Sequence, residues 1–525
     1  MIPQTPALHP FNGFDIPALV ALQAQRRPDH PFLIWEPFGG ASETWTYARF
    51  HHDIRRLAAG LAKRGVRSGD RVLVHLDNCP ETLLAWYACA HLGAVAVTTN
   101  ARSSADELAY FAAHSRSIAA ITQPRFAELV NGASRDFRFI AVTAHDNGDP
   151  PPAGFAPGRT ERFEALFGEA GNAPPRAPDP MHPVGVQYTS GTTSRPKGVL
   201  WTHANALWGA RINALHEDLH EDDVHLVHLP LFHTNAIAYS VLATLWAGGT
   251  AVIMPKFSAS RFWPLSLKHR CTWTSVIQFC VRALTTIERP SSHFYRYWGN
   301  AICEAPTDAH FGVRTIGWWG MTETISHGIV GSIHLPNEAM SCGRPAPEYG
   351  IVIENDEGQP VRPGETGHLL VNGIPGVSLF KEYLENRQAT EDAYDERGLF
   401  RTGDRVTLLD SGFIRFSDRD KDMLKVGGEN VAASEIERVV MTVKGVREAA
   451  VVAKKHPMLD EAPVVFVIAE EGIAKDAMPD RILDVCRGEL ASFKVPHEVR
   501  VVEEMPRSTL EKVAKAQLRK MLENA

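Results

Sequence analysis

Strand-like and helix-like segments alternate over the first 370 or so residues, and this alternation limits the possible folds more than any other feature. Short apolar runs that read as buried strands occupy 71–76, 94–99, 139–144, 184–189 and 250–254. Longer segments, such as 81–93 and 105–115, read as the intervening helices. Because neighbouring parallel strands need a long crossover connection, usually a helix, this order predicts a layered α/β domain with a largely parallel sheet.

Length, charge and cysteine usage exclude several other classes of protein. The 525 residues are too many for a single core, and the formal net charge of -7 argues against a nucleic-acid binder. The opening residues MIPQTPALHPFNG lack a secretory signal, and no apolar run approaches the roughly 18 residues of a membrane span. The seven cysteines are scattered without a CxxC pair, which is typical of reduced, mostly buried thiols. We therefore predict a cytoplasmic protein without an integral membrane segment.

The pattern changes after about residue 345, which indicates further domains. Short strands separated by Gly, Pro and Asp predict a β-rich subdomain at 345–418. A compact α+β unit then follows, with Ser434 as the N-cap of a helix, two strands, a second helix and a Lys-rich tail. The charge-dense segment SDRDKD separates the two patterns. We predict a large N-terminal domain at 1–418, a hinge at 419–422 and a small C-terminal domain at 423–525.

The loop YTSGTTSRPKGV, at 188–199, has the chemistry of a phosphate site. It does not fit the Walker pattern, because Pro196 precedes Lys197 and Gly198 follows it. Hydroxyls and free N–H groups of a Gly-containing turn nevertheless form a concavity that accepts anions, and a nearby cation neutralises charge. The candidate phosphate ligands are Thr189, Ser190, Gly191, Thr192, Thr193 and Lys197.

Two further motifs have defined chemistry, and one apparent motif does not. GWWGMTET, at 317–324, places an aromatic platform four residues before a carboxylate, which suits a nucleotide complexed with Mg²⁺. KVGGENV, at 425–431, has paired glycines that let its backbone approach a ligand closely. HEDLH, at 216–220, fits the HExxH zinc-protease pattern, but no third ligand is evident. We expect HEDLH to be a solvated surface connection that leads into a strand.

Taken in order, these segments resemble the signatures of the adenylate-forming superfamily, which includes acyl-CoA synthetases, luciferases and adenylation domains. LFRTGD, at 399–404, is similar to the ribose-binding turn of that family, and MPRSTLEKVAKAQLRK, at 505–520, to its catalytic-lysine segment. The resemblance covers about residues 20 to 520. It departs from the family at Ser194 and Glu511, where Gly is more usual. GIPGVSLFKEY and SFKVP look closest to the carnitine/crotonobetaine-CoA ligase branch.

The resemblance implies a nucleotide site in the large domain. Trp319 would lie on the adenine face, Thr322 would bond the α-phosphate and Glu323 would hold Mg²⁺. Asp404 would accept the two ribose hydroxyls. Further nucleotide contacts would come from Gly299, Asn300, Ala301, Gly320, Met321 and Arg419.

The resemblance also implies a mobile small domain that serves two half-reactions. Lys512 would be the catalytic lysine of adenylation, and Lys421 would be the hinge residue. The loop bearing Lys425, Gly427, Gly428 and Glu429 would bind coenzyme A in the second half-reaction.

The segment LPLFHTNAIAYS, at 229–240, resembles the family segment that lines the acyl pocket. Acetate-specific relatives close this pocket with Trp at the position of Gly320, so we expect an acid larger than acetate. The aromatic faces of Trp318 and Tyr239 would suit a quaternary ammonium such as carnitine, although short-to-medium-chain or aromatic acids fit too. The candidate pocket residues are His233, Asn235, Ala236, Tyr239, Trp318 and His327.

The implied activity is an ATP- and Mg²⁺-dependent ligation of a small carboxylic acid to coenzyme A through acyl-AMP. One alternative is an adenylation enzyme that passes the acyl group to a carrier protein or another acceptor. A luciferase-like oxygenase would share these motifs. A non-catalytic adenylate-binding protein is a third class, although it would be expected to lose Lys512 or Glu323. Dimers are common among the enzymes that the chain resembles, so a homodimer is a further expectation.

Overall fold

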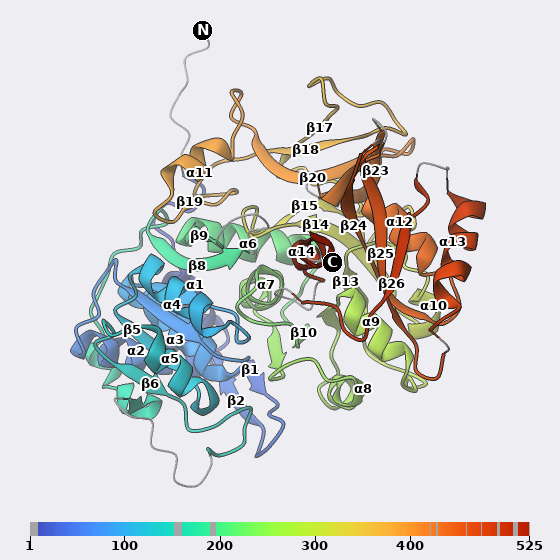
Figure 1. Cartoon of the computed structure of the whole chain (residues 1–525). Coiled ribbons are helices and arrows are strands. Elements are labelled where there is room, and N and C mark those ends of the chain that lie inside the picture. Colours follow the sequence, from blue (N-terminus) through green and yellow to red (C-terminus); the bar gives the residue numbers. More distant parts are fainter. Residues whose placement is uncertain are drawn as a thin grey trace. The chain divides into compact units, whose positions relative to one another are not determined.

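The computed structural model describes residues 9–151, 160–189, 196–419, 422–426, 429–457, 459–473, 475–490, 494–507 and 513–523. These residues cluster into two compact units, whose helices and strands are labelled in Figure 1. The first unit holds the described residues of 9–189, 196–350 and 372–394, and the second holds those of 351–371 and 395–523. The domain boundary at 418 and the hinge stay predictions, and the hinge residue Lys421 lies outside the described residues.

The first unit contains two mainly parallel sheets. In the larger, the strand order is β16-β15-β14-β13-β12-β10-β11-β1-β2, and the run from β14 to β1 is parallel. Its strands are β1 (Pro31–Trp35), β2 (Glu43–Thr46), β10 (Val224–Val227), β11 (Thr250–Ile253), β12 (Trp273–Ser275), β13 (Tyr297–Asn300), β14 (Arg314–Gly320), β15 (His327–Val330) and β16 (Arg344–Pro345).

The second sheet of this unit has the order β19-β9-β8-β4-β3-β5-β6-β7, and the run from β8 to β7 is parallel. Its strands are β3 (Arg71–His75), β4 (Val95–Thr98), β5 (Ala119–Thr122), β6 (Ile140–Val142), β7 (Glu161–Arg162), β8 (Pro183–Thr189), β9 (Lys197–Thr202) and β19 (Glu382–Tyr383). The five strands predicted at 71–254 are confirmed. The layered α/β class with largely parallel sheets is confirmed as well.

Helices connect and cover these strands. They are α1 (Ile16–Arg26), α2 (Tyr47–Lys63), α3 (Pro80–Leu92), α4 (Ala105–Ser115), α5 (Ala127–Ala133), α6 (His203–His216), α7 (Ala243–Ala247), α8 (Ala259–Lys268), α9 (Gln278–Thr285), α10 (Asp308–Phe311) and α11 (Arg387–Asp392). Local chemistry sets the ends of the two predicted helices. Pro80 at the first turn and Gly93 at φ 73° delimit α3, and a capping box of Ser104 and Glu107 starts α4.

Short 3₁₀ and π segments complete the first unit. The 3₁₀ turns are η1 (Pro124–Phe126), η2 (Phe163–Leu166) and η3 (Ala170–Asn172), and η4 (Asn235–Leu242) is a π-helix. A π-helix is rare and often lies at a functional site. The sequence pattern does not predict it.

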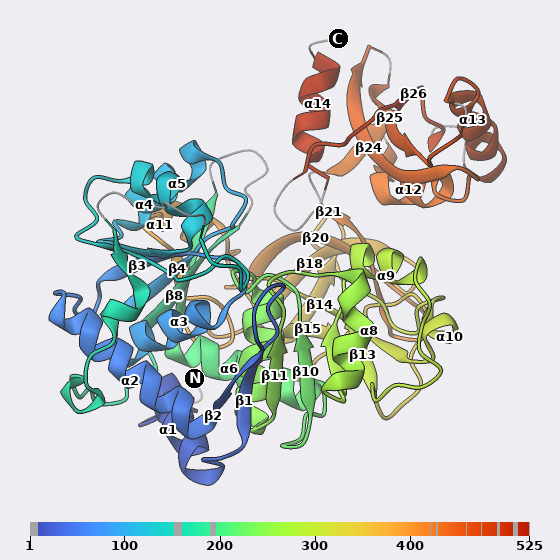
Figure 2. The same ribbon diagram turned by 90° about the horizontal axis from the view of Figure 1, so that it is seen from below.

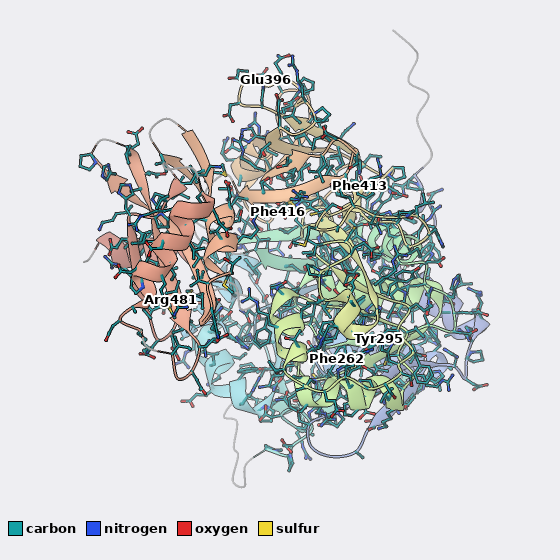
Figure 3. The ribbon with its side chains drawn as sticks, turned by 90° about the vertical axis from the view of Figure 1, so that its right-hand side faces the viewer. Phe262, Tyr295, Glu396, Phe413, Phe416 and Arg481 are labelled. Carbon is teal, nitrogen blue, oxygen red and sulfur yellow. The ribbon has the colours of Figure 1, made fainter. Side chains whose placement is uncertain are left out.

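Aromatic rings form part of the core behind the larger sheet. Phe262 on α8 stacks on Tyr295, with ring centroids 5.8 Å apart, and packs against Trp263 and Trp298 (Figure 3). All seven cysteines are buried free thiols, as their scatter predicts. In the described ranges, no helix combines the length and the apolar character needed to cross a bilayer.

The second unit contains two smaller sheets. One has the order β17-β18-β20-β21, formed by β17 (Gly350–Glu354), β18 (Thr366–Asn372), β20 (Phe400–Leu408) and β21 (Ile414–Arg419). The other has the order β23-β22-β25-β24, with β26 beside β25. Its elements are β22 (Met423–Val426), β23 (Glu429–Ala432), β24 (Val446–His456), β25 (Asp460–Ala469), β26 (Glu498–Val501), α12 (Ala433–Val440), α13 (Met478–Glu489) and α14 (Lys515–Glu523).

Alternating side chains of β24 and β25 build a core on each face of the last sheet. Val451 and Val465 pack with Ile436 of α12 and with α13, whereas Val452 and Phe466 pack with α14. Figure 2 shows α14 apart from α12 and α13, across this sheet. The two-residue period of a strand explains why both faces are apolar.

The structure corrects two sequence expectations. Ser434 is not the N-cap of α12. The cap is Ala432, while the Ser434 hydroxyl donates to the Ser417 carbonyl oxygen and its N–H donates to Asp418. HEDLH is solvated only in part. Glu217 is completely buried and His216 is paired with Glu348 at 3.0 Å, whereas His220 is exposed. Tertiary packing at the end of α6 buries Glu217, which the composition of the segment does not reveal.

Candidate functional site

The predicted nucleotide and acyl residues of the first unit gather where its strands end. Gly299 and Asn300 end β13, and Trp319 and Gly320 end the neighbouring β14. In layered α/β proteins, ligands bind outside the carboxyl ends of parallel strands. Thr189 at the end of β8 and the segment after β10 bring in residues from both sheets.

Thr322 is held by contacts from both sheets. The indole N–H of Trp201 on β9 donates to the Thr322 carbonyl oxygen at 2.9 Å. The Thr234 hydroxyl lies 3.2 Å from the Thr322 hydroxyl and 2.9 Å from Oε1 of Gln187 on β8. These buried and part-buried contacts hold both the backbone and the hydroxyl of Thr322 in place.

Glu323 is a buried carboxylate with defined partners. Its side chain is 4% exposed, and its Oε1 accepts a hydrogen bond from the Tyr383 hydroxyl at 2.8 Å. Its carbonyl oxygen accepts from the Phe380 N–H at 2.7 Å. Burial raises the pKa of Tyr383, and the charge of Glu323 raises it further, so this hydroxyl stays protonated and donates.

Lys197 links the predicted phosphate loop to this carboxylate. Thr189 on β8 pairs with Lys197 on β9, so the two residues stand at the base of the loop. The Lys197 ammonium lies 4.6 Å from the centroid of the Tyr383 ring, and Tyr383 bonds Glu323. Tyr383 therefore contacts a residue of each motif. The loop residues Ser190, Gly191, Thr192 and Thr193 lie outside the described residues.

A strained turn presents Thr322 and Glu323. The Met321 N–H donates to the Thr324 hydroxyl at 3.0 Å, and the Ile325 N–H donates to the Met321 carbonyl oxygen at 3.0 Å. Ile325 is buried at φ 55°, a left-handed conformation that is rare for a β-branched residue. Such strain persists only where surrounding contacts impose it, and it is frequent at functional sites.

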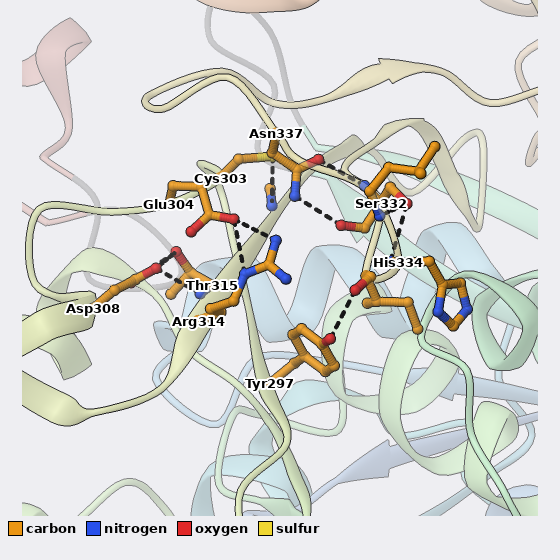
Figure 4. A network of polar contacts seen from close by, with 12 residues as sticks. Tyr297, Cys303, Glu304, Asp308, Arg314, Thr315, Ser332, His334 and Asn337 are labelled. Atoms are coloured by element: carbon orange, nitrogen blue, oxygen red, sulfur yellow. Dashed lines mark hydrogen bonds and ion pairs between the residues drawn. The ribbon is translucent and has the colours of Figure 1, made fainter.

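The segments that carry the predicted adenine contacts are anchored by a polar network (Figure 4). Arg314 at the start of β14 donates to Glu304 at 2.6 and 3.0 Å, and the Thr315 N–H donates to Asp308 at 2.9 Å. These bonds tie the segment after β13 to β14. Trp319 is buried on β14, Asn300 is buried at the end of β13, and Ala301 beside it is exposed.

The candidate acyl pocket has an aromatic wall. Trp318 stacks on His327, with centroids 4.3 Å apart and planes at 7°, and Tyr239 packs edge-on against both rings. Tyr239, Asn235 and Ala236 belong to the π-helix η4, and His233 lies just before it. We name Tyr239, Trp318 and His327 the aromatic wall.

Tyr239 limits the space beside Gly320. A Cβ at position 320 would come 2.5 Å from the Tyr239 hydroxyl. Tyr239 therefore occupies part of the space that a side chain at position 320 would need, and the expectation of an acid larger than acetate stays a prediction.

The remaining predicted residues belong to the second unit or lie outside the described residues. Asp404 on β20 and Arg419 on β21 are paired in register within the second unit, and Lys425 and Glu429 lie on β22 and β23 there. Gly427, Gly428 and Lys512 lie outside the described residues. Their roles stay predictions.

Sequence reasoning missed several residues that position this site: Gln187, Trp201, Thr234 and Tyr383. Each is an ordinary residue in an ordinary context, and only the fold places it beside Thr322 or Glu323. Spacing along the sequence does not indicate the role of Tyr383, because Tyr383 is 60 positions from its hydrogen-bond partner Glu323.

Comparison with known proteins identifies the class that this fold and site define. Residues 20–384 match the family model described as AMP-binding enzyme, and residues 435–512 match its C-terminal domain. The chain belongs to the AMP-binding enzyme family. This confirms the resemblance to adenylate-forming enzymes and the prediction of an enzyme.

Three known proteins are similar to the chain over most of its length. The chain is 32% identical over 509 residues to crotonobetaine/carnitine–CoA ligase of Escherichia coli O139:H28, covering 93% of this chain and 95% of that protein. It is similar to O-succinylbenzoate coenzyme A synthetase from Bacillus subtilis in complex with ATP and magnesium ion, at 27% identity, with a TM-score of 0.81 and coverage of 95% and 98%. An anthranilate CoA ligase in complex with anthranoyl-AMP shares the fold at 21% identity, with a TM-score of 0.84 and coverage of 98% of each chain.

Proposed function

We propose that the protein is an AMP-forming acyl-CoA synthetase. The substrate carboxylate attacks the α-phosphorus of ATP, which forms acyl-AMP and releases pyrophosphate. The thiol of coenzyme A then attacks the acyl carbon, which forms acyl-CoA and releases AMP. The family match and the names of the relatives support this reaction.

One observation carries the proposal within the structure: Tyr383 contacts both Lys197 and Glu323. A cation at the base of a phosphate-binding loop and a buried carboxylate are the two charged parts that an ATP-Mg²⁺ site requires. Their connection through one side chain supports a common role for the two motifs.

The residues present fit a magnesium ion. Mg²⁺ prefers oxygen ligands and binds through one or two carboxylates together with phosphate oxygens. Glu323 is a buried carboxylate that accepts from Tyr383, and Tyr383 also contacts Lys197. Glu323 would hold the ion. When bound, Mg²⁺ neutralises charge on the phosphate oxygens.

Thr322, Lys197 and Lys512 would stabilise the charge that develops during adenylation. Thr322 would donate to the α-phosphate, and its contacts with Trp201 and Thr234 hold it in place before the substrate binds. Lys197 and the loop residues Thr189 to Thr193 would hold the β- and γ-phosphates. Lys512 would approach the α-phosphate. The nucleotide itself would be held by Gly299, Asn300, Ala301, Trp319, Gly320, Met321, Asp404 and Arg419.

The second half-reaction would use the other face of the small domain. Rotation about Lys421 would exchange Lys512 for the loop of Lys425, Gly427, Gly428 and Glu429, which would bind coenzyme A. This exchange would remove a lysine that is needed only for the first half-reaction.

The acyl substrate would be larger than acetate and resemble carnitine or crotonobetaine. The names of the relatives and the aromatic wall support this class. His233, Asn235 and Ala236 would line the carboxylate end. The test is pyrophosphate release with a panel of carboxylic acids that includes carnitine, crotonobetaine, acetate, hexanoate and benzoate. Release with acetate alone would contradict this substrate class.

Changing Tyr383 to Phe is expected to weaken the use of Mg²⁺. The change removes the hydrogen bond to Glu323 while keeping the ring beside Lys197. Loss of such a supporting bond typically costs ten- to a hundredfold in metal affinity, so the Mg²⁺ concentration for half-maximal pyrophosphate release should rise about tenfold. Tyr297→Phe is the control, because its hydroxyl bonds the Ile333 carbonyl oxygen instead. Equal Mg²⁺ dependence in both variants would contradict this role.

Changing Tyr239 to Ala is expected to admit longer acids. Removing the ring frees space beside Gly320 and Trp318. Since each methylene in an apolar pocket changes kcat/KM by about tenfold or more, the ratio of kcat/KM for octanoate to that for butyrate should rise at least about tenfold. Tyr239→Phe keeps the ring and should leave the ratio near that of the unchanged protein. An unaltered chain-length profile in Tyr239→Ala would show that Tyr239 does not bound the pocket.

A further inference from the structure

Gln187 is a buried amide to which the proposed reaction gives no role. It lies on β8 in the interior of a sheet, where it pairs with Thr98 of β4 on one side and Val199 of β9 on the other. Its backbone is therefore fixed, and its side chain, at 4% exposure of the residue, is the part that can turn. Since a buried amide is costly without hydrogen-bond partners, the contacts of this side chain indicate its role.

Gln187 begins a row of polar side chains that ends at Thr322. Oε1 of Gln187 lies 2.9 Å from the Thr234 hydroxyl, and that hydroxyl lies 3.2 Å from the Thr322 hydroxyl. Thr234 directly precedes η4, and its hydroxyl makes no cap hydrogen bond to that helix. We name Gln187, Thr234 and Thr322 the polar chain. It connects the strand that leads into the phosphate loop with the residue that would bind the α-phosphate.

The number of hydrogens in the polar chain limits what it can do. Each threonine hydroxyl carries one hydrogen and donates one hydrogen bond at a time. If the Thr234 hydroxyl donates to Oε1 of Gln187, which faces it in the structure, only the hydrogen of Thr322 can make the contact between the two threonines. Thr322 then has no hydrogen left for a phosphate.

A turned amide gives the polar chain the opposite direction. The amide of glutamine has an oxygen that accepts and an NH₂ group that donates, and the two groups have nearly the same size. With Nε2 toward Thr234, Gln187 donates to Thr234, and Thr234 donates to Thr322. The hydrogen of Thr322 is then free for the α-phosphate. Of the two orientations of the amide, this is the one that serves adenylation.

We infer that Gln187 aims the hydroxyl of Thr322 at the substrate, by turning its amide nitrogen to Thr234 when ATP is bound. Phosphate oxygens only accept, so the bound nucleotide favours the direction in which Thr322 donates. A donor that is aimed before charge develops stabilises the transition state without further reorganisation. Gln187 is thus a positioning residue that acts through Thr234. The inference rests on the proposed acyl-CoA synthetase function and gives that function a residue outside its ligand-binding motifs.

Gln187→Glu tests the direction of the polar chain. A carboxylate has the shape of the amide but only accepts, so Thr234 must donate to it and cannot donate to Thr322. The kcat of acid-dependent pyrophosphate release should fall about a hundredfold, the usual cost of losing one aimed donor, and it should fall more than the KM for ATP rises. A purely structural contact predicts the opposite, because the carboxylate keeps the acceptor that faces Thr234. Gln388→Glu is the control, because it makes the same change at an exposed position on α11.

Thr234→Val separates the polar chain from the charge that Gln187→Glu adds. Valine keeps the branched shape of threonine and interrupts the chain, so this change alone should lower kcat about tenfold, as the loss of one hydrogen bond does. In the Thr234→Val background, Gln187→Glu should lower kcat less than about threefold further, because no hydroxyl remains to be reversed. Residues of one hydrogen-bond network are non-additive in this way, and the double-mutant cycle measures it.

Gln187→Met tests the same role without an added charge. Methionine has a similar length and offers only a weak acceptor, so Thr234 loses the donor that sets its direction. The kcat of pyrophosphate release should fall about tenfold in the otherwise unchanged protein and less than about threefold in the Thr234→Val background. Thermal unfolding identifies variants that do not fold, and Gln187→Met decides if Gln187→Glu is one of them.

Two outcomes would overturn the inference and leave the proposed function intact. One is an unchanged kcat in Gln187→Glu or in Gln187→Met. The other is a further hundredfold loss from Gln187→Glu in the Thr234→Val background, which would assign the effect to the added charge alone. Failure of the unchanged protein to release pyrophosphate with every acid in the panel would instead overturn the proposed function.

Discussion

Replacing Lys512 with Ala is expected to abolish acyl-adenylate formation while leaving thioester formation from preformed acyl-AMP close to its original rate. In the first half-reaction, negative charge grows on the α-phosphate and on the leaving pyrophosphate. A positioned cation stabilises that charge in the transition state more than in the ground state, and its loss typically costs a hundredfold or more in kcat. In the second half-reaction AMP leaves without pyrophosphate, and the proposed domain rotation moves Lys512 away.

The two half-reactions can be measured separately. Pyrophosphate release in the presence of acid and ATP reports the first, and acyl-CoA formed from synthetic acyl-AMP and coenzyme A reports the second. Lys520→Ala is a suitable control, because it removes an exposed lysine from α14 of the same segment. Equal loss of both half-reactions in Lys512→Ala would refute the role assigned to Lys512.

Replacing Glu323 with Gln is expected to have the second largest effect. The change keeps the size of the side chain and its capacity to accept from Tyr383, but it removes the charge that would hold Mg²⁺. Since the ion neutralises charge on the phosphates, kcat/KM for ATP should fall about a hundredfold or more. Raising the Mg²⁺ concentration should recover part of the loss.

Glu382→Gln is the matched control for Glu323→Gln. Glu382 is an exposed glutamate next to Tyr383, so the control removes the same charge from the surface beside the site. If Glu382→Gln and Glu323→Gln reduced kcat/KM equally, a specific Mg²⁺ role for Glu323 would be untenable. Thermal unfolding of both variants separates loss of activity from loss of structure.

The sequence predicted much of the fold because most elements have strong local signals. The apolar runs of β3, β4 and β11 are buried throughout or nearly so, and α4 carries its capping box in its own sequence. Local signals failed where tertiary packing decides the outcome. Ser434 has the chemistry of an N-cap, but it contacts Ser417 and Asp418 of β21 instead, and the helix begins two residues earlier than expected, at Ala433 with Ala432 as its N-cap.

Sequence motifs predicted the candidate ligand-binding residues. They did not predict the residues that keep those side chains in position. Thr322, Glu323 and Lys197 stand in recognisable segments, whereas Tyr383 and Trp201 acquire their positions only through folding. The burial of Glu217 was not predicted at all. Its polar neighbours suggested a solvated segment, and only the packing of α6 reveals that Glu217 is buried. The π-helix η4 could not be foreseen either, since its apolar sequence fits an ordinary helix equally well.

The central claim is that one protein joins a carboxylic acid to coenzyme A through acyl-AMP. The most direct measurement follows ATP, AMP, pyrophosphate and acyl-CoA together by mass spectrometry, for the acid that gives the fastest pyrophosphate release, with and without coenzyme A. Our account predicts one AMP and one pyrophosphate for each acyl-CoA formed, and acyl-AMP that accumulates on the protein when coenzyme A is omitted. Formation of ADP, or the absence of a coenzyme A-dependent thioester with every acid in the panel, would contradict it.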